Sequence, residues 1–207
     1  MSHSCNTIAP IPSASYSTRR VPLRTMRTMK HLVISCSLSP DSRSRPLAHM
    51  AVERLRARSA EVDFLDLAKT QLPQCDGGAS YGAATVREVT PRITEAAGLI
   101  VATPVYNYDV NSAAKNLLEL TGSAWRGKVV GFICAAGGTS SYMSVMGFAN
   151  SLMLDFRCLI VPRFVYAPEV EADDADFGEE ALRTRIDELA AEMLRLTTAL
   201  SADGSAR

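Results

Sequence analysis

Five short apolar segments, each followed by a stretch with helical spacing of its apolar residues, constrain the fold of this chain more than any other feature. The segment 98–103 is apolar almost throughout, which is typical of a strand buried on both faces of a sheet. Strands that alternate with helices predict an α/β domain whose parallel sheet is covered by helices on both faces. The predicted strands are 31–35, 62–66, 98–103, 128–135 and 158–161, and the predicted helices are 44–57, 85–97, 111–120, 140–154 and 179–200.

The first 28 residues differ in composition from the rest of the chain. They contain four arginines, no acidic residue and many Ser, Thr and Pro, without the periodicity of a helix or a strand. We expect 1–28 to be a disordered extension, either a transit peptide or residues upstream of the real start. The folded domain is then expected to span 29–200, followed by a disordered tail at 201–207.

Composition excludes several classes of function. Lys and Arg total 22, as do Asp and Glu, so the charge balance favours neither nucleic acid nor an anionic membrane as a partner. The five cysteines are scattered and form no CxxC pair, which predicts reduced thiols and a cytoplasmic location. Three isolated histidines do not predict a metal site. Two local expectations are that Pro91 either breaks the second helix or starts its second half, and that Trp125 packs at the surface.

The loop after the first predicted strand has the composition of a phosphate site. Residues 36–45 are rich in Ser and Arg and open a helix, whose first turn carries unpaired backbone N–H groups and a partial positive charge. Hydroxyl groups and a planar guanidinium would add further donors. The alternative is an ordinary helix cap in a Ser-rich turn. A thiol phosphatase is not favoured, because six residues separate Cys36 from Arg43 where that class needs five.

The loops after the third and fourth strands would supply flat surfaces and backbone donors. Tyr106 and Tyr108 offer aromatic faces after a stiff Pro104, and the pair Gly137-Gly138 allows a ligand to approach the main chain closely. The carboxyl ends of parallel strands lie at one edge of the sheet, where ligands bind in such folds. A phosphate loop beside a planar slot predicts a mononucleotide that carries an aromatic ring.

Three segments in order resemble the NAD(P)H-dependent FMN reductases of the flavodoxin-like superfamily: 36–44, then 98–107 with 114–120, and then 127–130 with 136–139. The resemblance is strongest to the reductases that serve sulfonate-utilising monooxygenases, and extends to related azo and quinone reductases. It implies a flavodoxin-like three-layer sandwich with strand order 2-1-3-4-5, with FMN at the carboxyl edge of the sheet. The residues that it implies for FMN are Ser37, Ser42, Arg43 and Ser44 at the phosphate, Pro104, Val105, Tyr106 and Asn107 beside the ring, and the main-chain amides of Gly137, Gly138 and Thr139 at its pyrimidine edge.

The chain departs from the family pattern at Cys36, where Gly is usual, and at Ser39, where Arg or Lys is usual. The resemblance implies hydride transfer from nicotinamide C4 of NADPH or NADH to N5 of FMN. Reduced FMN would then pass electrons to a monooxygenase, a quinone, an azo compound or oxygen. No side chain is expected to act as an acid or base. A homodimer or homotetramer is expected. A non-enzymatic FMN electron carrier and an FMN-less scaffold are the alternatives.

Overall fold

The computed structural model describes residues 29–170 and 174–203, so the extension expected at 1–28 lies outside the described residues. The strands are β1 (Lys30–Ser35), β2 (Glu61–Asp66), β3 (Gly98–Tyr106), β4 (Asp109–Val110), β5 (Val129–Ala135), β6 (Leu159–Ile160) and β7 (Val165–Ala167). The helices are α1 (Ser44–Ala57), α2 (Ala84–Glu95), α3 (Ser112–Thr121), α4 (Met146–Phe156) and α5 (Glu179–Asp203), with short 3₁₀ turns at Ala79–Gly82, Gly122–Trp125 and Tyr142–Val145.

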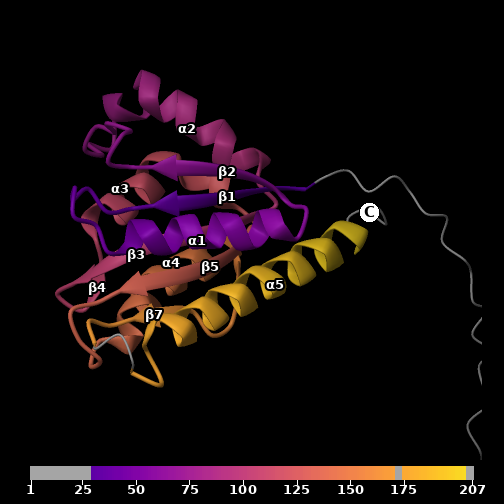
Figure 1. Ribbon diagram of the computed structural model, residues 1–207. Coiled ribbons are helices and arrows are strands. Elements are labelled where there is room, and N and C mark those ends of the chain that lie inside the picture. Colours follow the sequence, from indigo (N-terminus) through magenta and orange to yellow (C-terminus); the bar gives the residue numbers. More distant parts are fainter. Residues whose placement is uncertain (1–28, 171–173, 204–207) are drawn as a thin grey trace, which may run out of the picture.

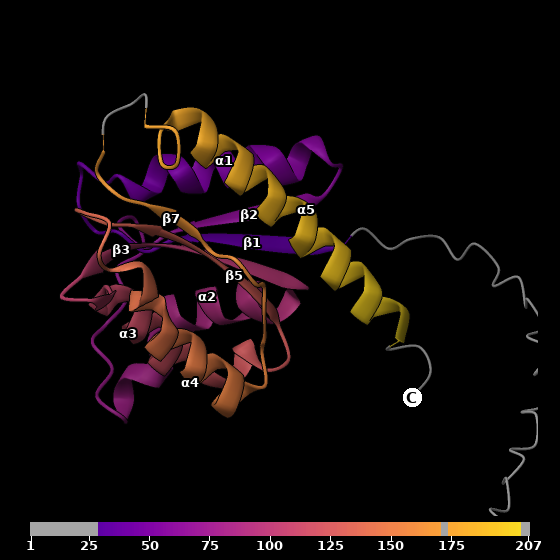
Figure 2. The same ribbon diagram turned by 90° about the horizontal axis from the view of Figure 1, so that it is seen from below.

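The helices form two layers around one sheet. Helices α1 and α5 cover one face of the sheet, and α2, α3 and α4 cover the other (Figures 1 and 2). The parallel strands point in one direction, so the loops that follow β1, β3 and β5 gather at one edge of the molecule, at the left in Figure 1. This is the edge at which the sequence places the ligand.

The sheet has the predicted order. Its path runs β2-β1-β3-β5-β6, and β7 also pairs with β5, so the five predicted strands lie in the order 2-1-3-4-5. The last predicted strand, 158–161, corresponds to β6, and β7 was not expected. Residues 161–164 lie opposite 131–132 of β5, which places two extra residues between β6 and β7. Strand β4 was not expected; it pairs antiparallel with the end of β3.

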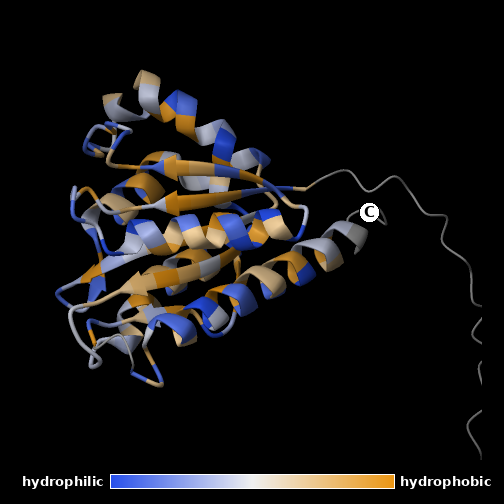
Figure 3. Cartoon of the chain, in the orientation of Figure 1, coloured by the Kyte–Doolittle hydropathy of each residue, from blue (hydrophilic) through white to orange (hydrophobic). Residues whose placement is uncertain are grey.

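Each face of the sheet has its own apolar core. The strands are predominantly hydrophobic along their length, whereas the helices turn one stripe inward (Figure 3). Leu32, Leu99 and Phe132 belong to the core under α2, α3 and α4. Val33 and Ile100 belong to the core under α1 and α5. Burial on both faces explains why the central strands lack the alternation of an exposed sheet.

Four local expectations need correction. Helix α2 continues through Pro91, because that residue lies on the exposed face, where water can solvate the carbonyl that loses its partner. Trp125 is fully buried, and its indole N–H donates to Thr121 Oγ1 at 2.9 Å. The predicted helix at 140–154 begins as a 3₁₀ turn and becomes α-helical only at Met146, and α5 extends to Asp203.

Candidate functional site

Three loops at the carboxyl edge are held together by hydrogen bonds between side chains and main chain. The side chain of Asn111, at the start of α3, donates to the carbonyl of Cys36 at 2.7 Å and accepts from Thr103 Oγ1 at 3.1 Å. Arg43, at the start of α1, donates to the carbonyl of Ala136, which follows β5, at 2.9 Å. The segments that the sequence singles out for the ligand are therefore neighbours on one rim.

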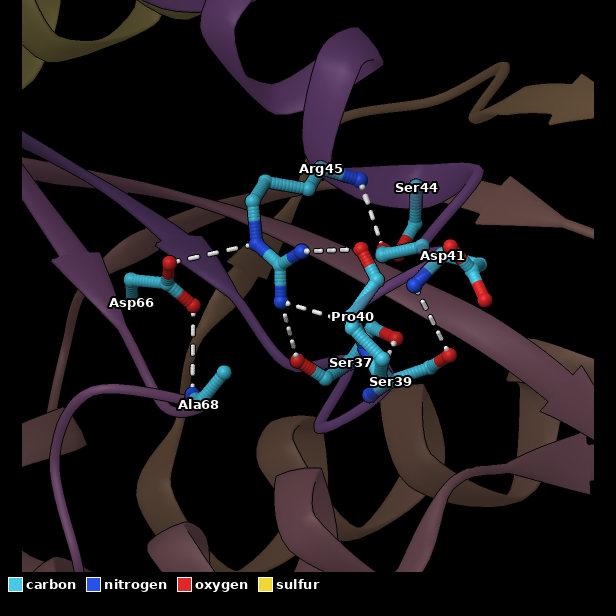
Figure 4. A network of polar contacts seen from close by, with 9 residues as sticks. Ser37, Ser39, Pro40, Asp41, Ser44, Arg45, Asp66 and Ala68 are labelled. Carbon is cyan, nitrogen blue, oxygen red and sulfur yellow. Dashed lines mark hydrogen bonds and ion pairs between the residues drawn. The ribbon is translucent and has the colours of Figure 1, made fainter.

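Serine side chains organise the loop between β1 and α1. The buried Ser37 hydroxyl accepts from the N–H of Ser39 at 3.3 Å, and Ser42 Oγ accepts from the N–H of Arg45 at 3.1 Å (Figure 4). Ser42 Oγ also lies 3.3 Å from Ser44 Oγ. Two of the four predicted phosphate residues, Ser42 and Ser44, thus lie together at the N-terminus of α1, where the helix dipole favours an anion, and Ser37 lies in the loop that leads to it.

Backbone donors in this loop are available for a ligand. Among the described residues, the N–H groups of Leu38, Ser42 and Arg43 have no hydrogen-bond acceptor. Hydrogen bonds to a charged acceptor are typically worth about 1.5–3 kcal/mol each, so three such donors suit a phosphate monoester. The loop therefore offers an anion such as phosphate both main-chain N–H groups and hydroxyl groups.

Arg43 points away from the serine cluster. Besides Ala136, its guanidinium donates to the carbonyl of Pro168 at 3.0 Å and lies 3.3 Å from Glu169 Oε2. The side chain is about half exposed, so its ion pair with Glu169 contributes little to stability. In this structure Arg43 links the start of α1 to the segments after β5 and β7, and its predicted contact with phosphate stays a prediction.

The predicted ring residues form a hairpin. Pro104, Val105 and Tyr106 end β3, which turns back into β4 through Asn107 and Tyr108. Both turn residues have positive φ, 52° and 63°, as in a two-residue type I′ turn. Such backbone is unfavourable for Tyr108, and strain of this kind gathers at functional sites. The side chains of Tyr106 and Tyr108 are 56% and 57% exposed, so both aromatic faces are accessible to a ligand.

The third loop leaves its glycines uncovered. A Cβ atom added to Gly137 or Gly138 would meet no atom within 4 Å, and Thr139 is exposed. The Tyr166 hydroxyl donates to the carbonyl of Gly138 and lies 2.8 Å from Ser141 Oγ, which fixes the loop from β7. The predicted pyrimidine-edge residues therefore lie at the same rim as the phosphate loop, on a main chain that a flat ring can approach.

The model of the NADPH-dependent FMN reductase family matches residues 29–172, which is most of the chain and includes all three loops. The chain belongs to this family. Members combine the flavodoxin-like fold with an oxidoreductase activity that uses FMN and NAD(P)H.

Several relatives support this placement. An NAD(P)H-dependent FAD/FMN reductase of Geobacillus thermodenitrificans is 27% identical over 85% of this chain and 97% of its own length. An FMN reductase (NADPH) of Escherichia coli is 35% identical over 56% of this chain and 62% of its own. The crystal structure of an oxidoreductase from Corynebacterium diphtheriae superimposes with a TM-score of 0.69 at 22% identity, over 84% of this chain and 99% of that one, which shows the shared fold.

Cys36, which replaces the usual family glycine, is not a nucleophile. Its side chain is fully buried, and burial together with the neighbouring Cys134 raises the pKa of its thiol far above the physiological range. A neutral buried thiol cannot attack phosphate, so the structure agrees with the sequence argument against a thiol phosphatase. Within 29–170 and 174–203 there is also no cluster of His, Cys, Asp and Glu suited to a metal ion, and no helix there is long and apolar enough to cross a membrane.

Sequence reasoning missed three residues that shape the rim: Arg45, Asp66 and Asn111. Asn111 could have been found, because an Asn just before a helical pattern is a typical N-cap, and its side chain does accept from the N–H of Ala114. Arg45 and Asp66 meet at 3.1 Å from two different elements. Nothing in the sequence alone indicates that pairing.

Proposed function

We propose that the chain binds FMN across the three-loop rim and reduces it with NADPH or NADH. The observation that carries this proposal is the set of unpaired backbone donors at the N-terminus of α1, on the same rim as an exposed aromatic hairpin and an open glycine loop. The phosphate would lie against Ser37, Ser42 and Ser44, and the ring would lie between the hairpin and the glycine loop.

The protein would contribute position and electrostatics rather than acid–base chemistry. Bound FMN supplies the acceptor for hydride from nicotinamide C4, at its N5 atom. The main-chain amides of Gly137, Gly138 and Thr139 would donate to the pyrimidine edge, where negative charge increases on reduction. No histidine from the described part of the chain lies among the rim residues, in keeping with a step that needs no general acid.

The proposal for the final electron acceptor rests on the chemistry of reduced flavin and on the similarity to an azoreductase. A flavin at an open rim can pass electrons to a monooxygenase, a quinone, an azo compound or oxygen. An NADPH azoreductase of a Bacillus strain, 25% identical over 74% of this chain, supports an acceptor of the azo type. The four cysteines within the described residues form no disulfide, which supports the proposal that the protein acts in the cytoplasm.

An anaerobic titration tests this function. The protein is mixed with FMN, NADPH is added in steps, and the visible flavin absorbance is followed. Stoichiometric bleaching that requires the protein supports a reductase. Binding of FMN without bleaching by NADPH or NADH would instead support a non-enzymatic electron carrier. Failure to bind FMN would support an FMN-less scaffold protein.

Arg43 should matter more to FMN affinity than to the fold. Replacing it with Ala removes the donors to Ala136 and Pro168 and also the cation predicted to reach the phosphate. We expect the Kd for FMN to rise about tenfold or more, which corresponds to about 1.4 kcal/mol or more. Because the side chain is half exposed, the midpoint of urea unfolding should barely move.

The matched control is Glu169→Gln, which removes only the exposed ion pair. It should leave FMN affinity within about twofold, since such pairs are worth about 0–1 kcal/mol. An Arg43→Ala variant with wild-type affinity for FMN, measured by fluorescence quenching, would rule out the assignment of Arg43 to the site.

The exposed face of α4 and the turn before it suits a second copy of the chain. Met143, Met146, Met153 and Leu154 are 38–73% exposed, and no charged residue occurs between Lys128 and Asp155. Uncharged, methionine-rich surfaces are typical of interfaces. We therefore propose that this face forms the homodimer contact, alone or within a homotetramer.

Leu154→Glu should weaken that dimer. Burying one leucine is worth about 1.5–3 kcal/mol, so we expect the dimer Kd to rise about tenfold or more in light-scattering measurements. Leu200→Glu, at an exposed leucine on α5, is the control and should leave assembly unchanged. A Leu154→Glu variant that assembles like the wild type would place the contact elsewhere.

A further inference from the structure

The side chain of Arg45 lies beneath the loop that the sequence assigns to phosphate. Its Nη2 donates to the carbonyls of Ser37 and Ser39, both at 3.1 Å, and its Nη1 reaches the carbonyl of Pro40 at 3.4 Å (Figure 4). The side chain is only 19% exposed. One guanidinium therefore binds three carbonyl groups of the loop, those of Ser37, Ser39 and Pro40.

Asp66 holds this guanidinium in place. Its Oδ2 lies 3.1 Å from Arg45 Nε, and its Oδ1 accepts from the N–H of Ala68 at 3.1 Å. Asp66 is the last residue of β2, in register with Ser35 at the end of β1, so the anchor is part of the sheet. Because the carboxylate neutralises the guanidinium, the pair acts on the loop mainly through geometry rather than through net charge.

The contact of Arg45 with the carbonyl of Ser37 also orients the N–H group of the same peptide unit. The C=O and N–H of a trans peptide point in opposite directions, so holding the carbonyl of Ser37 against Arg45 turns the N–H of Leu38 away from it. That N–H has no acceptor among the described residues. A loop whose donors are already oriented spends less free energy on reorganisation when an anion binds.

Arg45 also contacts the loop through its main chain. Its backbone N–H donates to Ser42 Oγ, which fixes the serine beside the unpaired N–H groups of Ser42 and Arg43. One residue thus orders both halves of the loop, by its side chain at 37–40 and by its main chain at Ser42. Arg43, by contrast, contacts Ala136 and Pro168, outside the loop.

We propose that Arg45, anchored by Asp66, is a positioning residue that presets the loop for a phosphate monoester and so makes the site selective for FMN over riboflavin. This inference rests on the proposed function. Arg45 does not touch the flavin; it acts through the carbonyls of Ser37, Ser39 and Pro40. Its contribution should therefore appear only for ligands that carry the phosphate.

The test measures Kd for FMN and for riboflavin with the full-length wild type and Arg45→Lys. Lysine keeps the positive charge but cannot span two carbonyls and a carboxylate with a planar fork. We expect the preference for FMN, the ratio of the two Kd values, to fall about tenfold, through a rise in the Kd for FMN while that for riboflavin changes less than about twofold.

Arg56→Met is the matched control. Arg56 lies on the same helix and also caps a carbonyl, that of Val62 at 3.2 Å, at the end of α1 far from the loop. Both flavin affinities should stay at the wild-type values. Should Arg45→Lys fail to fold, Asp66→Asn removes only the anchoring charge and is expected to reduce the preference for FMN in the same direction.

The possible outcomes distinguish the role of Arg45 from the proposed FMN site itself. An unchanged preference for FMN in Arg45→Lys or Asp66→Asn, with a wild type that prefers FMN, overturns the role of Arg45 alone. Equal losses for both flavins also overturn it, because they indicate a purely structural role. A wild type that binds both flavins equally contradicts the phosphate site itself, and the proposed function with it.

Discussion

Replacing Ser42 with Asp is expected to raise the Kd for FMN about 100-fold or more, equivalent to about 2.7 kcal/mol. The new carboxylate would lie where Ser42 Oγ now caps the N–H of Arg45, at the predicted phosphate position. Two unit charges about 5 Å apart repel by about 3 kcal/mol at an effective dielectric constant of about 20, and the flavin phosphate carries more than one charge.

The same substitution should not unfold the protein. Asp is a favourable residue at a helix N-terminus, where a negative charge typically contributes about 0.3–1 kcal/mol of stability. Thermal unfolding should therefore stay unchanged or shift upward while FMN affinity is lost. This combination separates damage to the site from damage to the fold.

Ser42→Asn is the matched control, since Asn has the same shape as Asp and also caps helices, but is neutral. Fluorescence titrations with FMN and riboflavin compare the two variants. We expect Ser42→Asp to discriminate against FMN and to bind riboflavin much as Ser42→Asn does. If the two variants bind FMN with similar affinity, no phosphate lies near residue 42.

Replacing Trp125 with Ala is expected to lower the free energy of unfolding by about 3–5 kcal/mol, the largest effect on stability that we predict. The side chain is fully buried, packs edge-on against Phe148 with ring centroids 6.5 Å apart, and donates to Thr121 Oγ1. Its removal leaves a cavity between α3 and α4 and takes away the indole donor from Thr121 Oγ1, which keeps its own hydrogen bond to the carbonyl of Leu117.

Trp125→Phe serves as the control, because it keeps a ring in the cavity and loses the indole hydrogen bond. Its destabilisation should be less than half that of the alanine variant when both are measured by urea unfolding. Equal and small losses for both variants would contradict the buried position of Trp125.

The sequence predicted the fold well where the pattern is continuous. The five predicted strands and their order are confirmed. The pattern is clearest in β1, β3 and β5, whose apolar runs are buried on both faces of the sheet. It was wrong on Trp125, since an aromatic residue beside a polar turn gives no sign of the cavity that tertiary packing provides. It also missed β4 and β7, which are too short to show a periodicity.

The location of the candidate site could be predicted from the sequence, but the side-chain contacts within it could not. Glycines, serines and exposed tyrosines in loops at one sheet edge marked the rim because such residues serve a ligand better than a core. The contacts of Arg43 with Ala136 and of Arg45 with Asp66 join residues 93 and 21 positions apart. Both arginine side chains are long and flexible, so their partners are determined only by the folded structure. The spacing of residues along the chain does not predict these partners.

A crystal structure of the protein with FMN would test the central claim most directly. The account predicts phosphate oxygens within about 2.7–3.2 Å of the N–H groups of Leu38, Ser42 and Arg43, with the flavin ring between the Tyr106–Asp109 turn and Gly137. Density for FMN at another place on the molecule, or a rim without ligand at saturating FMN, would contradict it.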